Sequence, residues 1–283
     1  MVGMPAPALL LQVMEHVAQR YVHKPENCTE SAVQRLEQTG YALLEYLEAL
    51  LAGKNISAVA LFPQYRDLQA LMGNDKVQPA DLWGGALTSA VPPIAVNVPA
   101  LLYDTDTRSR LAQAVLQLVK SADAVAAARL KDISLGLLRT AGAEQPHAVF
   151  WGVAAGFFDA LASRLLVADV YVKRVASRVL MQYGAFAKGD KALPERLLQE
   201  MLFFCAQTQG GVGRATVLET VRVSMGLQQH APVDYVEPRF GRFDPAVLAL
   251  ARKRIASAAE TWSALVGGDK SKLKAAVDQF SLV

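Results

Sequence analysis

One apolar stretch limits the folds open to this chain more than any other feature. It covers residues 148–162, reads AVFWGVAAGFFDALA, and carries a single charge at Asp159. A membrane-spanning helix needs roughly 20 apolar residues, so the stretch is too short to cross a bilayer, and Arg164 follows it closely. Gly152 and Gly156 stand four residues apart and permit another helix to approach one face. A helix that is apolar nearly all round is typical of the centre of a bundle.

Most other long segments have helical periodicity. From Val33 the apolar residues recur on one helix face, with capping-box spacing at Ser31 and Gln34 and Gly53 just past the end. No alternating run of β-branched residues is long enough to indicate a sheet. We therefore predict an all-α fold of two helical bundles in tandem, with phosphotransfer-domain-like up-down packing. Further helices are expected at 58–72, 104–120, 123–140, 146–162, 167–188, 194–209, 215–228, 246–266 and 270–280.

A change in amino-acid composition divides the chain. Residues 84–100, GGALTSAVPPIAVNVPA, contain two glycines and three prolines, which disfavour helix, so we predict a linker or an extended strap there. Its apolar character suggests that it lies along a helical surface. The expected parts are an N-terminal helical part (1–83), this linker (84–100), a central helical bundle (101–235) and a further helical module (236–283). The last part stops within an amphipathic helix, and we expect it to be truncated from a longer parent protein.

Composition indicates a globular intracellular protein. The 283 residues are 52% apolar with a formal charge of +3, which is too small a charge to indicate nucleic-acid binding. The basic residues are scattered apart from Arg252-Lys253-Arg254, a triplet typical of a solvated helix face. Cys28 and Cys205 form no Cys-x-x-Cys pair and are expected to be ordinary thiols in a reducing compartment. The N-terminus lacks the pattern of a secretory signal, so we expect a cytoplasmic location, no membrane insertion and protein rather than nucleic-acid partners.

The sequence offers no pattern for catalysis or metal binding. The nearest approach to a phosphate loop is GGVGRAT at 210–216, which lacks the Gly-x-x-x-x-Gly-Lys spacing and follows a helix. We interpret Gln209–Arg214 as a turn between helices. Cys205 lies in an apolar run and is expected to be buried and inert. We therefore predict no catalytic residue, no cofactor-binding residue, no metal ligand and no cofactor. Four aromatic residues leave a ligand pocket open as an alternative to plain core: Phe157, Phe158, Phe203 and Phe204.

The histidines argue against phosphotransfer. None of the four pairs with another at i, i+3 or i, i+4 in the way that a helical metal site requires. A phosphoacceptor histidine on a helix usually has the pattern His-x-x-Lys-Gly, and the contexts here read HVAQR, HKPEN, HAVFW and HAPVD. None of them fits that pattern. The four residues are His16, His23, His147 and His230.

Several helical signatures together resemble a family. Residues 46–83, YLEALLAGKNISAVALFPQYRDLQALMGNDKVQPADLW, resemble a stretch of the N-terminal part of the chemotaxis-type hybrid histidine kinases that govern type IV pili (the PilL/ChpA type), and are similar to the related FimL pilus scaffold proteins. FWGVAAGFFDALA (150–162), VKRVASRVLMQY (172–183) and LLQEMLFFCAQTQ (197–209) resemble the helices that follow. FGRFDPAVLALARKRIASAAETWSAL (240–265) resembles the start of the next helical module.

The resemblance implies a scaffold and no catalytic residue. The parent kinases carry phosphotransfer domains, an ATP-binding core, a coupling domain and a receiver domain, and this chain has the motifs of none of them. The resemblance therefore implies a non-catalytic docking segment of a chemosensory kinase that controls type IV pili and twitching motility. The alternatives are an active histidine phosphotransfer domain with an atypical histidine, and an unrelated helical ligand-binding protein.

The glycine pair makes the central-helix prediction testable. Gly156→Leu is expected to destabilise the fold by overpacking, on the order of 1–3 kcal/mol. A thermal melt that matches the wild type would contradict the prediction.

Overall fold

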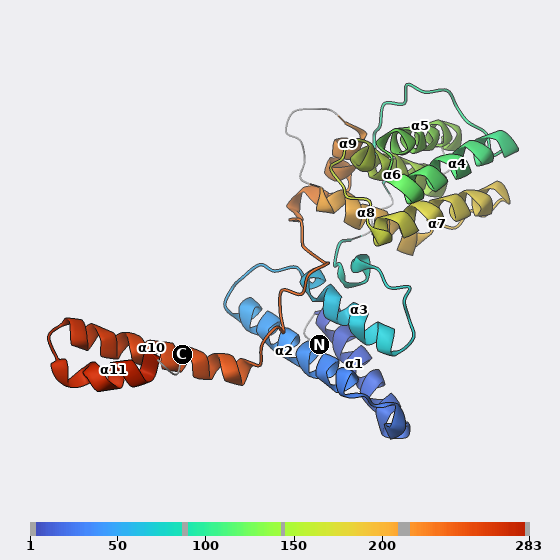
Figure 1. Cartoon of the computed structure of the whole chain (residues 1–283). Coiled ribbons are helices and arrows are strands. Elements are labelled where there is room, and N and C mark those ends of the chain that lie inside the picture. Colours follow the sequence, from blue (N-terminus) through green and yellow to red (C-terminus); the bar gives the residue numbers. More distant parts are fainter. Residues whose placement is uncertain (1–3, 87–89, 143–144, 209–215, 281–283) are drawn as a thin grey trace. The chain divides into compact units, whose positions relative to one another are not determined.

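The regular elements of the chain are helices. The computed structural model describes residues 4–86, 90–142, 145–208 and 216–280, and within these ranges no strand occurs. The predicted all-α fold is thereby confirmed (Figure 1). Contacts divide the chain into two compact units, one formed by Met1–Asp75 with Tyr235–Val283 and the other by Lys76–Asp234. The expected segmentation at 83, 100 and 235 stays a prediction.

The first unit begins with three α-helices. They are α1 (Pro5–His23), α2 (Glu30–Leu51) and α3 (Phe62–Leu71), and α3 packs against both α1 and α2. The predicted capping box at Ser31 is wrong, because the cap of α2 lies two residues earlier, at Thr29, whose side chain accepts from Ala32 N at 3.2 Å. The predicted helix at 58–72 is a 3-10 turn (Ala58–Leu61) followed by α3. Gly53 and Gly73 follow α2 and α3 with positive φ, as helix-ending glycines do.

The first unit also contains a C-terminal helical hairpin. It consists of α10 (Pro245–Val266) and α11 (Leu273–Phe280), which pack against each other across the short 3-10 turn Lys270–Lys272. Asp244 caps α10 by accepting from Ala246 N at 2.8 Å, and Pro245 occupies the first position. The helix predicted over 246–266 is therefore confirmed.

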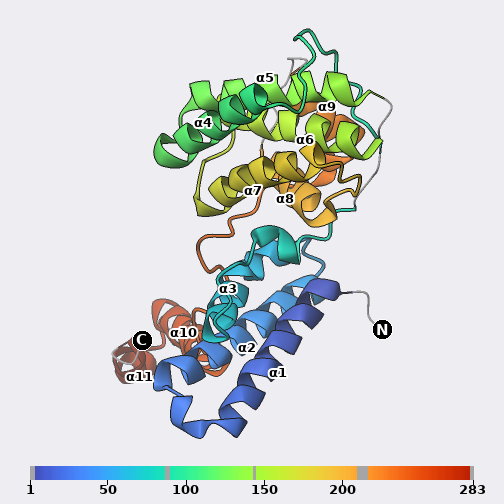
Figure 2. The same cartoon turned by 90° about the vertical axis from the view of Figure 1, so that its right-hand side faces the viewer.

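Within its described residues, the second unit is a bundle of six α-helices. Figure 2 shows them grouped around α6. They are α4 (Thr105–Ser121), α5 (Ala124–Ala141), α6 (Gln145–Ala162), α7 (Val170–Ala187), α8 (Glu195–Gln207) and α9 (Val217–Ser224). A 3-10 turn, Pro79–Leu82, precedes them, and another, Leu227–Gln229, follows them.

Two predicted boundaries in this bundle need correction. The helix expected from Val167 begins at Val170, because Asp169 accepts from Tyr171 N and Val172 N at 2.9 Å and so caps α7. The helix predicted from Asp123 is confirmed as α5, which Asp123 caps by accepting from Val125 N at 2.9 Å. The helix expected over 215–228 ends at Ser224, where the chain turns into a 3-10 segment through Gly226. Gln209–Arg214, interpreted as a turn, lies outside the described residues.

The apolar stretch forms the centre of the bundle, as predicted. Helix α6 packs against α5, α8 and α9, and its residues from Ala148 to Leu161 are buried, with Phe150, Trp151, Phe157 and Phe158 fully inaccessible to solvent. Its one charge, Asp159, is 6% exposed. The Asp159 carboxylate lies 3.5 Å from Lys131 Nζ on α5 and accepts from Leu218 N at 3.0 Å in the first turn of α9.

The proline-rich segment lies along the bundle. Leu101 N donates to the Gly136 carbonyl at 3.1 Å, and Arg139 donates to the Val98 carbonyl at 3.0 Å. A Cβ at Gly136 would lie 2.9 Å from the Pro99 carbonyl oxygen, so glycine permits this close approach. Residues 92–101 therefore form a strap along the bundle, as their apolar character suggests, and residues 98–101 of this strap lie on α5.

The two glycines of α6 face different neighbours. A Cβ at Gly156 would lie 2.7 Å from Val221 Cγ2 of α9, whereas a Cβ at Gly152 would lie 3.0 Å from Pro92 Cδ in the strap. The prediction that both glycines admit one helix is wrong for Gly152. The physical reason is the same at both positions, because an absent Cβ lets another chain segment approach the helix axis.

Gly156→Ala tests this close contact directly. The added methyl group meets a β-branched side chain that has little room to move, so we expect destabilisation of about 1–3 kcal/mol by overpacking. Urea unfolding measures the change. Gly184→Ala in α7 is the matched control, since a Cβ there meets nothing within 4 Å, and it should stabilise by about 0.5–1 kcal/mol. Equal effects at the two sites would refute the packing argument, and Val221→Ala should relieve the first.

Candidate functional site

The four histidines lie in unrelated environments. His16 and His23 are exposed on α1, where His23 Nδ1 lies 2.7 Å from the Gln19 carbonyl. His147 is 6% exposed, its Nε2 lies 2.8 Å from the Asp190 carbonyl, and its ring lies 4.0 Å from that of Phe186. His147 is thus enclosed in the core of the second unit, where a phosphoryl donor has no access to its ring.

The remaining histidine of this unit packs on an aromatic residue. The His230 ring lies 5.2 Å from Trp83 in an edge-to-face arrangement. No three potential metal-ligating side chains among the described residues converge on one point. The predicted absence of metal ligands and catalytic residues stays a prediction.

The aromatic residues singled out by the sequence pack as core. Phe157, Phe158, Phe203 and Phe204 are all fully buried, with the Phe157 and Phe204 rings 6.1 Å apart and Trp83 5.9 Å from Phe203. Rings at these separations fill the space between α6 and α8 with offset and edge-to-face contacts. Their arrangement supports the core interpretation over the alternative of a pocket between them.

The two cysteines differ sharply in reactivity. Cys28 is exposed and Cys205 is fully buried. Burial raises the pKa of the Cys205 thiol to about 12, so almost none of it is thiolate near neutral pH. The predicted burial of Cys205 is confirmed, and the thiol is expected to be inert.

A groove of the second unit carries the most distinctive surface chemistry. It encloses about 790 Å³ beside α7, with walls from the end of α4, the start of α8 and residues 76–78. Exposed apolar side chains of α7 stand along it, with Val170 55% and Met181 69% exposed. Five cationic side chains line it against one carboxylate, that of Asp169. The cations are Lys76, Lys173, Arg174, Arg178 and Arg196.

A network of ion pairs holds two of the arginines that line the groove, Arg178 and Arg196. Glu200 is 1% exposed and pairs with two arginines. Arg178 donates to both oxygens of its carboxylate, and Arg196 lies 3.5 Å from one of them. Arg196 also binds Asp81 at 3.1 Å. Burial raises the pKa of Glu200, and the adjacent Arg178 guanidinium opposes that rise. We regard the carboxyl group as ionised, because an arginine that hydrogen-bonds both of its oxygens favours the charged form.

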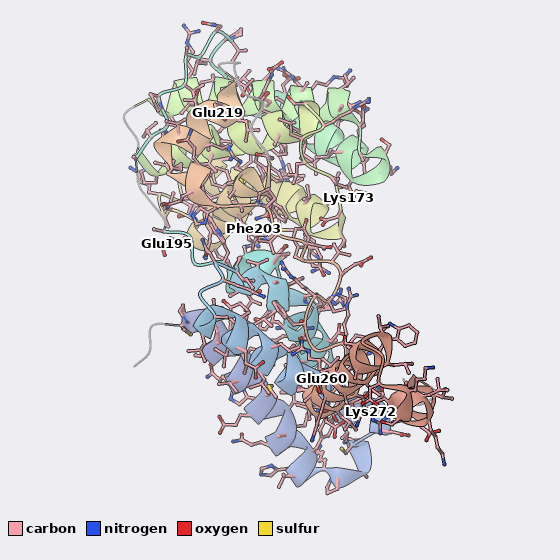
Figure 3. The ribbon with its side chains drawn as sticks, turned by 90° about the vertical axis from the view of Figure 1, so that its left-hand side faces the viewer. Lys173, Glu195, Phe203, Glu219, Glu260 and Lys272 are labelled. Carbon is pink, nitrogen blue, oxygen red and sulfur yellow. The ribbon has the colours of Figure 1, made fainter. Side chains whose placement is uncertain are left out.

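The cations that line the groove differ in how their side chains are held. Arg174 donates to the Val77 carbonyl at 3.3 Å and lies 5.8 Å from the centre of the Tyr171 ring. Lys173, near the start of α7 (Figure 3), makes no hydrogen bond or ion pair through its ammonium group with any residue in the part of the chain that the structure describes. Arg196 keeps 62% of its side chain exposed despite its two ion pairs.

The groove was not predicted from the sequence. Along the chain its basic residues are scattered, since Lys76, Lys173 and Arg196 belong to separate elements. One signal was present: Lys173, Arg174 and Arg178 share helical spacing, which places them on one side of α7. Lys76 and Arg196 reach the same place only through packing.

The fold and this surface define an all-α bundle with a basic groove, a form suited to binding other proteins. Residues 98–238 match the family model for the FimL scaffold protein second domain. The match spans α4 to α9 and relates the chain to FimL scaffold proteins. No curated protein and no solved structure matches the chain. Among the described helices, none is long and apolar enough to cross a membrane.

The contrast between the two thiols gives a direct test of the core. With its pKa near 12, Cys205 is about one part in ten thousand thiolate at pH 8, and it is shielded as well. We expect Ellman's reagent to titrate one thiol rapidly in the folded protein and two in guanidinium chloride. Cys28→Ser should abolish the rapid thiol. Rapid reaction of both thiols in the native wild type would contradict the burial of Cys205.

Proposed function

We propose that this chain is a non-catalytic scaffold that docks protein partners of a chemosensory system controlling type IV pili and twitching motility. The observation that carries the proposal is the match of residues 98–238 to the second domain of the FimL scaffold protein. The resemblance of the flanking segments, 46–83 and 240–265, to the N-terminal region of pilus-controlling histidine kinases supports the same system. A cytoplasmic location follows from that proposal.

The architecture of the bundle supports a docking role. A helix buried on all sides gives the unit a rigid interior, and a rigid surface loses less conformational freedom when a partner binds. Two potentially nucleophilic side chains of the bundle are engaged within the fold: His147 lies in the aromatic core, and Cys205 is a buried thiol. The exposed side chains of the groove are of the kind that binds a partner rather than of the kind that catalyses a reaction.

Affinity capture tests the scaffold proposal. The tagged full chain, expressed in a piliated bacterium that encodes it, should retain chemosensory or pilus-regulating proteins identified by mass spectrometry. A tagged helical protein of similar size and charge serves as the control. Retention of neither class of protein above the control level would count decisively against the proposal.

Phosphotransfer is the measurement that separates a scaffold from a relay domain. The chain is incubated with an active kinase core and radiolabelled ATP, and with a phosphorylated response regulator. We expect no acid-labile label on the chain, since His147 is buried and no histidine has the His-x-x-Lys-Gly context. Label on His16, His23, His147 or His230 would replace the scaffold proposal with a relay.

A further inference from the structure

We propose that the basic groove beside α7 binds an acidic, amphipathic helical segment of a partner protein. This inference rests on the proposed scaffold function and adds the surface and the chemistry of the partner. Its starting point is the charge of the groove: five cationic side chains, with Asp169 as the one carboxylate among the residues that line it.

The carboxylates near the groove do not cancel its positive charge. Glu200 and Asp81 pair with Arg178 and Arg196, and Asp169 caps α7 by accepting from Tyr171 N and Val172 N. Even with these three carboxylates included, five cations leave the groove positive. The ammonium group of Lys173 has no partner among the described residues and is half-buried at the groove wall, so a carboxylate there would gain a contact without breaking one.

The arginines are positioned in advance. Arg178 is fixed by Glu200, Arg196 by Asp81 and Glu200, and Arg174 by the Val77 carbonyl. A guanidinium group has five N–H donors, and these internal bonds use only some of them. Holding a side chain in place before binding reduces the entropy that ordering it would cost, so the remaining donors are available to a carboxylate at low cost.

The apolar flanks favour a protein over a nucleic acid. Val170 and Met181 lie at positions separated by three helical turns of α7, on either side of the cations, and both are more than half exposed. Methionine at an exposed binding surface adapts to partner side chains. A phosphate backbone has no apolar group to cover these residues. An amphipathic helix with glutamates at its centre and leucines at its ends satisfies both features.

A peptide binding experiment on the full chain tests this proposal. The probe is a fluorescein-labelled helical peptide with glutamates in the middle of one face and leucines at both ends of that face; a second peptide has glutamine in place of each glutamate. Fluorescence anisotropy should detect binding of the first peptide and much weaker binding of the second. Binding should weaken as salt is raised, because the Debye length falls from about 10 Å at 0.1 M to about 3 Å at 1 M.

A pair of charge reversals locates the site. Lys173→Glu should weaken binding of the acidic peptide about ten-fold, since it replaces an attraction by a repulsion. Lys188→Glu is the matched control: it makes the same charge change just past the end of α7, about 22 Å further along the helix at 1.5 Å per residue, and should change affinity by less than about two-fold. Circular dichroism melts of both variants should match the wild type. Arg178 is not used, because its loss would leave the buried Glu200 carboxylate unpaired.

Each other result overturns the proposal. It fails if the acidic peptide does not bind at about 1 mM, if both peptides bind equally, if the two variants bind alike, or if a single-stranded oligonucleotide competes better than the acidic peptide. Affinity capture with Lys173→Glu separates this failure from that of the scaffold function. If the wild type and Lys173→Glu retain partners equally, the scaffold proposal holds and the groove is not the binding site. If the wild type retains no partner, the scaffold proposal itself is wrong.

Discussion

The burial of α6 on every side is the constraint on which the second unit depends. Helices α5, α8 and α9 pack against it, and aromatic rings of α7 also contact it, so each neighbour meets a surface of aromatic or small residues rather than a narrow stripe. Gly156 brings Val221 of α9 close to the helix axis, and Gly152 does the same for Pro92 of the strap. Because the helix is too short for a bilayer and too apolar for water, enclosure by the rest of the chain is the arrangement that removes its surface from solvent.

The buried polar groups decide how the helices meet. Asp159 joins α6 to Lys131 on α5 and to the first turn of α9. Arg222 of α9 donates to the Cys205 carbonyl at 2.9 Å and to Thr208, and thereby satisfies carbonyl groups at the end of α8. A buried polar group left without a partner is costly, so each of these contacts penalises alternative packings that the apolar side chains alone would tolerate.

These features explain how a chain without evident catalytic motifs presents a defined surface. The apolar interior and its polar contacts hold α7 and α8 in place, and Glu200 fixes the arginines between them. The resulting groove collects positive charge in a protein whose net charge is only +3. In this relative of FimL scaffold proteins, the proposed docking of acidic partners derives its selectivity from electrostatic complementarity with this surface.

The sequence by itself determined the helical class, most helix positions and the central place of α6, because these follow from local periodicity, caps such as Asp244 and uninterrupted apolar character. It also carried the family resemblance in its apolar signatures. Several local details escaped it, such as the cap at Thr29 and the early end of α9, where neighbouring capping residues compete and short segments turn into 3-10 helix. Only the tertiary structure decided which neighbour each glycine of α6 admits and which cations meet. Lys76, Lys173 and Arg196 are far apart in the chain, and side-chain packing between α4, α7 and α8, which no local pattern encodes, brings them to one groove.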